Sequence, residues 1–210
     1  MKVTRDGILN WLKACAEALS RDRDYLTQLD AAIGDADHGA NMDRGFQAVL
    51  SRLPGVADKD IGTILKTAGM ALVSTVGGAA GPLYGTFFMQ AGVSTAGKME
   101  LSPEELVAAV EAGVNGVIAR GKATLGDKTM VDALVPALEV LRSAVCDGTP
   151  LRDALRQAAA AAAKGAQDTI PMVARKGRAS YLGDRSAGHQ DPGATSSSLL
   201  LTAAAETLMG

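Results

Sequence analysis

The sequence predicts an all-α protein, folded as an antiparallel up-and-down helical bundle or a closed helical barrel. Apolar residues recur at helical spacing along most of the chain, strand signals are weak, and roughly eight helical segments are joined by short connections. Hydrophobic residues make up 47% of the chain but aromatic residues only 3%, which is typical of closely packed, alanine-rich helices. For 210 residues we expect a single domain, residues 1–210, with one sizeable core.

In the first half of the chain, helices are expected over residues 4–20, 24–31, 39–52 and 60–76. Thr4 is a suitable N-cap for the first of them, and Trp11 on that helix should lie in the core. Pro82 is well placed to begin the next helix.

In the second half, Ser102-Pro103-Glu104-Glu105 is a capping box that begins a helix over residues 103–120. Further helices are expected over residues 130–145, with a kink at Pro136, and from Thr149-Pro150 through a run of alanines. The last helix, residues 194–209, should pack against the first.

Charge and cysteine content exclude several classes of protein. The formal net charge of -2 gives no overall attraction to nucleic acid or to an anionic membrane, and no stretch is long enough to span a bilayer. Cys15 and Cys146 lie far apart without metal-ligand spacing, so we expect a reduced, cytoplasmic protein with both thiols in the core. Residues 1–11 lack the apolar run of a signal peptide.

The most informative stretch is residues 30–41. Asp30, Asp35 and Asp37 fall within eight residues, and a turn at Gly34 would let their carboxylates converge. Oxygen ligands without a nearby thiolate suit a hard cation such as Mg²⁺, Mn²⁺ or Ca²⁺. The alternative is that these aspartates are helix caps and loop residues in water. An EF-hand is excluded, because Phe46 stands where that loop needs a glutamate.

Three further segments are candidates for the same site. Residues 38–41 precede an amphipathic run, so the N–H groups of a helix start would favour phosphate beside the metal. The four glycines of residues 77–85 would admit a ligand close to the backbone, or serve tight helix packing, but they match neither a P-loop nor a dinucleotide fingerprint. Residues 175–193 are expected to be a long loop without secondary structure, rich in arginine, that offers positive charge to a phosphate or an acidic partner, or is simply solvated.

Four motifs, in this order, resemble those of the nucleotide-binding L subunits of dihydroxyacetone kinase. They are residues 34–41, 77–86, 126–130 and 174–183, and the resemblance extends over nearly the whole chain. It implies an antiparallel eight-helix barrel with the nucleotide site at one end.

The resemblance implies that Asp30, Asp35 and Asp37 hold two Mg²⁺ ions, which bind the phosphates of ADP or ATP. Formal charge agrees with two metals, because three carboxylates and two dications leave +1 to accept a polyphosphate. The implied nucleotide contacts are His38, Gly39, Ala40, Asn41, Ala79, Ala80, Gly121, Met130, Arg178, Asp191, Pro192 and Gly193. Arg178 would also be catalytic, by stabilising charge on the transferring phosphoryl group. Ala80 stands where many relatives have serine, which should weaken nucleotide binding without abolishing it.

The implied activity is that of a kinase acting on an alcohol group as one subunit of a complex. Dihydroxyacetone would be held on a separate subunit, and ADP would be rephosphorylated in place by a phosphohistidine-carrying subunit of the phosphotransferase system. Two alternatives remain open: an ATP-exchanging kinase subunit for another ketose or polyol, and a nucleotide sensor that binds a transcription regulator.

Overall fold

A computed structural model of the chain describes residues 2–209 and confirms the all-α prediction. The described residues contain nine α-helices, two 3-10 helices and two short strands: β1 (Val3–Thr4), α1 (Arg5–Arg21), α2 (Arg23–Ile33), α3 (His38–Arg52), η1 (Leu53–Gly55), α4 (Ile61–Thr75), α5 (Ala80–Ser94), β2 (Glu100–Leu101), α6 (Pro103–Gly121), α7 (Val131–Cys146), α8 (Leu151–Asp168), η2 (Arg178–Ser186) and α9 (Pro192–Thr207).

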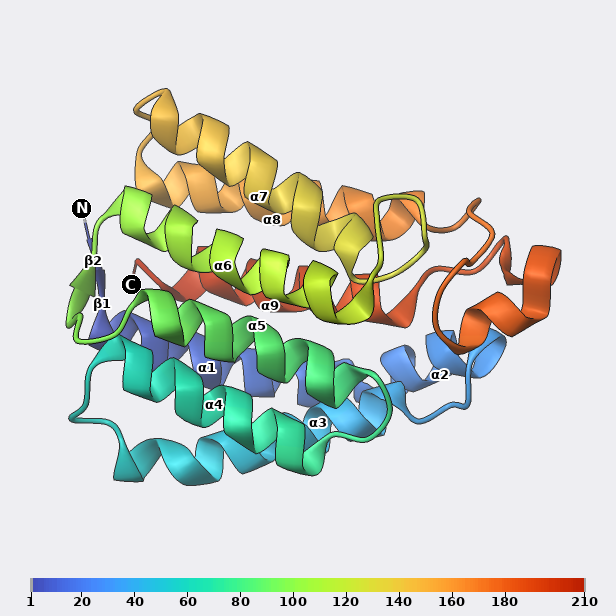
Figure 1. Ribbon diagram of the computed structural model, residues 1–210, viewed down its shortest axis with the longest axis horizontal. Coiled ribbons are helices and arrows are strands. Elements are labelled where there is room, and N and C mark those ends of the chain that lie inside the picture. Colours follow the sequence, from blue (N-terminus) through green and yellow to red (C-terminus); the bar gives the residue numbers. More distant parts are fainter. Residues whose placement is uncertain (1, 210) are drawn as a thin grey trace.

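Eight of these helices pack in a closed ring. Each helix from α3 to α9 contacts the next along the chain, and the ring closes because α1 packs against both α9 and α3. Figure 1 shows that neighbouring helices run in opposite directions, so the expected up-and-down barrel is confirmed. The short helix α2 lies at one end of the barrel, against α3 and η2.

Side-chain caps fix the helix starts at the end of the barrel that carries β1 and β2. Thr4 accepts a hydrogen bond from the Gly7 N–H, which confirms it as the N-cap of α1. Ser102 and Glu105 form the predicted capping box of α6. Asp60 caps α4 through the Thr63 N–H. The starts of α1, α4 and α6 are therefore capped by side chains of the chain itself, whereas α8, which begins at the same end, has no side-chain cap.

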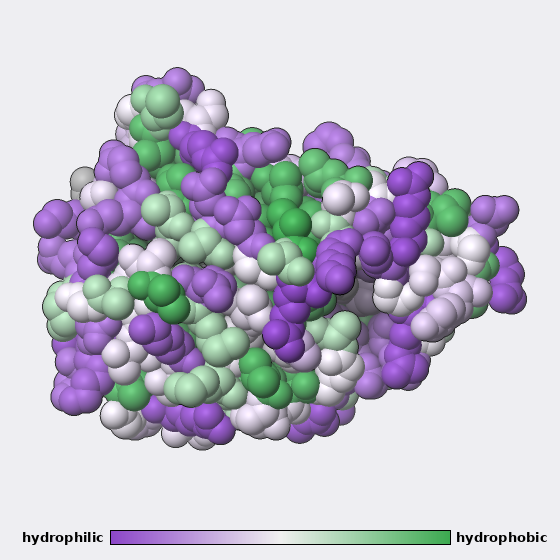
Figure 2. Space-filling view, in the orientation of Figure 1, coloured by the Kyte–Doolittle hydropathy of each residue, from purple (hydrophilic) through white to green (hydrophobic). Residues whose placement is uncertain are grey.

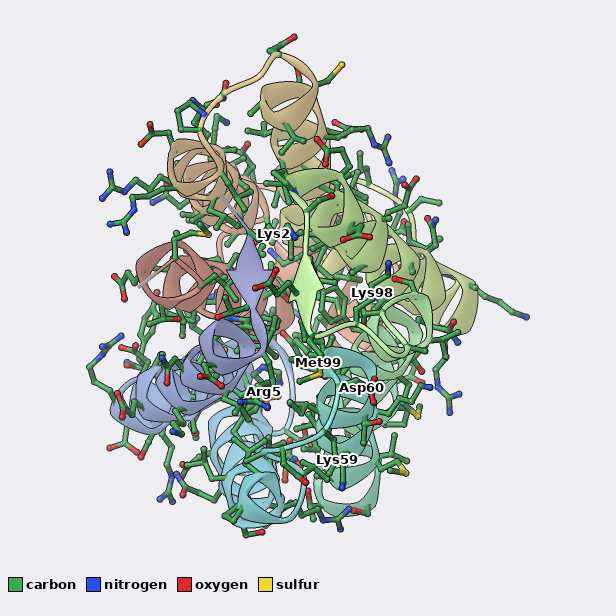
Figure 3. All side chains as sticks on the ribbon, turned by 90° about the vertical axis from the view of Figure 1, so that its left-hand side faces the viewer. Lys2, Arg5, Lys59, Asp60, Lys98 and Met99 are labelled. Carbon is green, nitrogen blue, oxygen red and sulfur yellow. The ribbon has the colours of Figure 1, made fainter. Side chains whose placement is uncertain are left out.

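The strand pair fastens the start of α1 to the α5–α6 connection, and a separate backbone hydrogen bond fastens the start of α4 to it (Figure 3). Val3 pairs with Leu101 and Thr4 with Glu100 in antiparallel register. The Arg5 N–H donates to the Met99 carbonyl at 3.0 Å, and the Ile61 N–H donates to the Lys98 carbonyl at 2.8 Å. These contacts hold helices of the barrel in register at the end opposite α2.

The core consists mainly of alanine, leucine and valine, with a small aromatic cluster. Trp11 packs on Phe88 with ring centroids 5.6 Å apart, and its indole N–H donates to the Leu200 carbonyl at 2.9 Å. That bond joins α1 to α9, as predicted. Cys15 is buried, but Cys146 is exposed, because it lies on the solvent side of the last turn of α7, so its predicted core position was wrong.

Three other sequence predictions need correction or stay open. Residues 175–193 are not a structureless loop, because Ser180 and Ser186 form local hydrogen bonds that fold η2 within them. Helix α5 begins at Ala80, so Pro82 lies inside its first turn rather than at its start. Helix α7 continues through Pro136, and the kink there stays a prediction.

The surface is mixed in character. Figure 2 shows hydrophilic and hydrophobic residues interspersed on the face seen in Figure 1. Among the helices described, none combines the length and apolar character needed to cross a membrane.

Gly165 supports the close approach of α8 to α7. A Cβ atom at this position would lie 2.1 Å from the backbone carbonyl oxygen of Asp132, which has no room to move. Gly165→Ala should therefore lower the free energy of unfolding by about 3 kcal/mol, the upper part of the usual range for overpacking. Chemical denaturation measures this change.

Gly55→Ala is the matched control, because nothing lies within 4 Å of a Cβ atom there. It should change the free energy of unfolding by less than about 1 kcal/mol. Equal stability of the two variants would contradict this account of the α7–α8 contact.

Candidate functional site

A cavity opens at the end of the barrel where α3, α5, α7 and α9 begin, the end that carries α2 and η2 in Figure 1. The space among its lining residues, including the part open to solvent, amounts to about 850 Å³. Its lining comes from residues within 30–41, 77–84, 128–130, 176–179 and 191–193, and none of it from α1, α4, α6 or α8. Helix starts carry partial positive charge and free N–H groups, so this cavity favours an anion.

Asp30 has two tasks at the rim of this cavity. It lies in the last turn of α2, and its Oδ2 accepts hydrogen bonds from the N–H groups of Asp37 at 2.9 Å and His38 at 3.1 Å. Asp30 thereby caps the start of α3, although Asp37 occupies the N-cap position and makes no capping bond of its own. The Asp37 carboxylate is therefore available for another partner.

The carboxylates of Asp30, Asp35 and Asp37 converge, as the sequence predicted. One oxygen from each can be chosen so that all three lie within 4.8 Å of one another. The donors are oxygen atoms only, and Asp30 has Oδ1 remaining after Oδ2 has capped α3. The residues present therefore fit a hard cation such as Mg²⁺.

Two backbone features make this convergence possible. A Cβ atom on Gly34 would lie 2.0 Å from Asp30 Oδ1, so only glycine fits beneath that carboxylate. Ala36, between the other two aspartates, adopts a left-handed conformation with φ of 62°. For a residue other than glycine that conformation costs about 1 kcal/mol, so the surrounding contacts must impose it.

Helix η2 brings a cation to the carboxylates. Its Ala179 packs with Ile33 at the end of α2 and with Ala174, and Leu182 lies against this small cluster. Arg178 then places Nη2 3.0 Å from Asp35 Oδ2, with its side chain still 64% exposed. The guanidinium thus stands at the mouth of the cavity, paired but accessible.

His38 belongs to a network of hydroxyl groups behind the cavity. Its Nε2 lies 2.8 Å from Ser196 Oγ, and the Tyr84 hydroxyl bonds with Ser196, Ser197 and the Gly193 carbonyl. Burial lowers the pKa of His38, and the charges of Asp30 and Asp37 only partly oppose this effect. His38 is therefore a neutral hydrogen-bonding group near pH 7 rather than a fixed positive charge.

The glycine-rich turn presents an uncapped helix start. No side chain caps α5, whose N-cap position is occupied by Ala79, and Gly78 makes the turn with φ of 63°. Opposite this turn, Asn41 accepts a hydrogen bond from Arg44 at its amide oxygen, which leaves the Asn41 NH₂ group to donate elsewhere. Both features provide donors to an anion in the cavity.

The structure brings most of the predicted site residues together. Asp30, Asp35, Asp37, His38, Asn41, Ala79, Ala80, Met130, Arg178, Asp191, Pro192 and Gly193 all line the cavity. Gly39, Ala40 and Gly121 do not. Gly39 instead lets α3 approach α2, because its Cβ would lie 2.0 Å from the Arg23 carbonyl oxygen. The contact of Gly39, Ala40 and Gly121 with a nucleotide stays a prediction, as does that of the residues that line the cavity.

The sequence prediction missed several lining residues, among them Tyr84, Lys128, Thr129 and Lys176. Tyr84, Lys128 and Thr129 lie inside motifs that were recognised, at residues 77–86 and 126–130, and Lys176 lies in the fourth motif, at 174–183. These motifs were therefore enough to locate the segments that form the site, but they did not show which of their side chains face the cavity.

Comparison with known proteins finds similar chains among kinase subunits. A family model described as the DAK2 domain matches residues 32–206. The ADP-binding subunit of the PEP-dependent dihydroxyacetone kinase of Escherichia coli K12 is 53% identical over 196 residues, which are 93% of each chain. The ADP-binding subunit of the PTS-dependent dihydroxyacetone kinase of Lactococcus lactis is 38% identical, over 99% of this chain and 97% of the relative.

A solved structure shares the fold. It is the dihydroxyacetone kinase of C. freundii in complex with AMP-PNP and Mg²⁺, with a TM-score of 0.70 and 28% identity. The match covers 93% of this chain and 33% of that one, so the chain spans about a third of the larger protein.

Asp191, the N-cap of α9, gives the site a pH dependence that can be measured. Burial raises the pKa of its carboxyl group to about 7, against the opposing effects of the Ala194 N–H and the Lys128 charge. Between about pH 4 and pH 7 the folded protein therefore holds a proton that the unfolded chain has released. This group destabilises the fold progressively as pH rises through that window.

Asp191→Asn should remove that contribution, because asparagine caps a helix equally well and does not titrate. We expect the variant to gain stability relative to the native chain as pH rises from 5 to 7.5, measured by thermal unfolding at each pH. His38 changes the pH dependence of stability in the opposite direction, because its pKa is lowered. It is present in both proteins, so its effect cancels in the comparison. Parallel curves for the two proteins would contradict the assignment.

Proposed function

The chain belongs to the DAK2 domain family, and we propose that it is the nucleotide-binding subunit of a dihydroxyacetone kinase. It would hold ADP or ATP with two Mg²⁺ ions and donate the phosphoryl group to dihydroxyacetone bound on a separate subunit. The observation that carries this proposal is the convergence of Asp30, Asp35 and Asp37 within 4.8 Å, beside helix starts that favour an anion. The 53% identity to an ADP-binding subunit of equal length supports it.

Each aspartate has a defined part in holding the metals. Asp30 would use Oδ1, because Oδ2 already fastens the start of α3. Asp37 would use a carboxylate that no capping bond engages, and Asp35 would exchange its ion pair with Arg178 for a metal. Bound Mg²⁺ supplies charge neutralisation and orientation for phosphates.

Arg178 is proposed as the catalytic cation. A planar guanidinium binds phosphate oxygens through paired N–H groups, and Arg178 already stands within 3.0 Å of the carboxylate cluster. With Asp35 engaged by a metal, Arg178 would be free to bind an anion such as the terminal phosphate. There it would stabilise the negative charge that spreads over the transferring group.

The remaining lining residues would hold the rest of the nucleotide. The uncapped start of α5 offers N–H groups at Ala80 and Gly81, and Asn41 and His38 offer side-chain donors or acceptors. Met130 and Pro192 supply apolar surface to the cavity lining. Surface of this kind suits the nucleoside part of the ligand.

The phosphoryl source is proposed to be a phosphohistidine protein that recharges ADP without releasing it. The PEP-dependent and PTS-dependent names of the two relatives support this proposal. The competing proposal is exchange of ATP for ADP with the solution. Turnover with free ATP as the sole donor, in the presence of the substrate-binding subunit, would favour exchange.

Asp35→Asn tests the metal role of the cluster. The change keeps the shape of the side chain but removes a negative charge, so Mg²⁺ and ADP should no longer be retained, while helix content is unchanged. Isothermal titration with Mg²⁺ and ADP, together with circular dichroism, measures both properties.

Asp43→Asn is the matched control, because this carboxylate lies on α3 outside the cavity lining. It should bind ADP as the native chain does. Retention of ADP by Asp35→Asn would refute the proposed site, and loss of helix content would show that the aspartates are structural.

Ala80→Ser tests the phosphate contact at the start of α5. Ala80 lines the cavity at the first residue of the helix, so a serine hydroxyl there would add one hydrogen bond to an anionic ligand. We expect ADP affinity to rise by roughly threefold to tenfold, equivalent to about 1 kcal/mol. Titration calorimetry measures the affinity.

Ala160→Ser, on an exposed position of α8 that contributes nothing to the cavity, is the control for the same chemical change. Unchanged or weaker ADP binding by Ala80→Ser would place the phosphates away from this turn.

A further inference from the structure

Lys128 is a buried lysine in the wall of the cavity. Its side chain belongs to the connection between α6 and α7, and the residue is only 1% exposed. Its ammonium donates to the carbonyl of Thr169 at 2.5 Å and to the carbonyl of His189. Lysine is almost never fully buried unless partners hold it, so this arrangement calls for an explanation.

The two carbonyls belong to segments that meet beneath the nucleotide cavity. Thr169 follows the last residue of α8, and its hydroxyl also accepts a hydrogen bond from the Asp191 N–H at 2.9 Å. His189 comes two residues before Asp191, in the segment that leads to the start of α9. Lys128 at His189 and Thr169 at Asp191 thus fasten to the end of α8 the short segment that leads into the turn Asp191-Pro192-Gly193.

The backbone around Lys128 is held in an uncommon shape. Lys128 has φ of 62°, which costs about 1–2 kcal/mol for a residue with a side chain. Asp132 maintains this shape, since its carboxylate accepts the N–H of Gly126 at 2.6 Å and the N–H of Thr129 at 2.8 Å. The loop is therefore built so that the lysine points inward.

Two carboxyl groups, those of Asp191 and Asp132, act on the charge of Lys128. Burial lowers the pKa of Lys128, while the negative charges of Asp191 and Asp132 act in the opposite direction. Removing the ammonium would leave two carbonyls without their donor and would take away the positive charge that favours the ionised form of Asp191.

We propose that Lys128 is a positioning residue for the nucleotide, acting through the Asp191-Pro192-Gly193 turn that it fastens to α8. This inference rests on the proposed function, because the turn is taken to contact the nucleotide. The Lys128 ammonium already donates to two backbone carbonyls of the protein, so we assign its effect on the nucleotide to the turn rather than to direct contact. Its loss would loosen one wall of the cavity and leave the aspartate cluster, on α2 and the loop before α3, intact.

Lys128→Met is the variant that tests the proposal, because it keeps most of the side-chain length and removes the ammonium. We expect ADP affinity, measured by calorimetry in the presence of Mn²⁺, to fall about tenfold or more. The affinity for Mn²⁺ alone should stay within about twofold of the native value, because the aspartates are untouched. A lysine that merely supported the fold would move both affinities together.

Lys122→Met is the matched control. Lys122 lies in the same connection and also has a left-handed backbone, with φ of 50°, but it is exposed. It should bind ADP as the native chain does.

Thr169→Val provides a second readout, because the valine has the same shape but cannot accept the Asp191 N–H. If Lys128 and Thr169 act through the same turn, the combined variant should lose less ADP affinity than the product of the two single losses. Independent effects that multiply would overturn the proposal.

The proposal is also overturned if Lys128→Met binds ADP within about twofold of the native chain, or if it loses Mn²⁺ and ADP binding together. A native chain that binds Mn²⁺ but no ADP would instead refute the proposed function, and so the two failures are distinguishable.

Discussion

The site depends most on the Asp30 carboxylate, whose two oxygens have different roles. One oxygen accepts the N–H groups of Asp37 and His38 and so fixes where α3 begins, and the other stays free beside Asp35 and Asp37. Because Asp30 does the capping, the Asp37 carboxylate need not. The loop from Gly34 to Asp37 is shaped around this carboxylate, since a side chain at Gly34 would collide with it. A single side chain thus couples the local fold to the proposed metal site.

The closed ring of antiparallel helices explains why this end of the barrel favours an anion. Alternation sends α3, α5, α7 and α9 away from the same end, so their starts surround one cavity. At the opposite end, Thr4, Asp60 and Ser102 satisfy the starts of α1, α4 and α6 with their own side chains. At the cavity, α5 has no such cap. The start of α5 therefore leaves free N–H groups for a ligand in the cavity.

The sequence predicted the helices well because their caps and periodicity are local signals, as with Thr4 and the Ser102 capping box. It also predicted that three aspartates would converge, since Gly34 marks the necessary turn. It did not predict the fold of residues 178–186, which depends on short-range bonds of Ser180 and Ser186. Nor did it assign Lys128, because the burial of a lysine depends on carbonyls 41 and 61 residues away in the chain.

Native mass spectrometry of the purified chain, incubated with ADP and Mg²⁺, can determine whether the aspartate cluster holds a two-metal nucleotide. We expect a dominant species whose mass equals the chain plus one ADP and two Mg²⁺ ions, because three carboxylates need two dications to present a positive site to a polyphosphate. A chain that keeps its unliganded mass under these conditions would contradict this expectation.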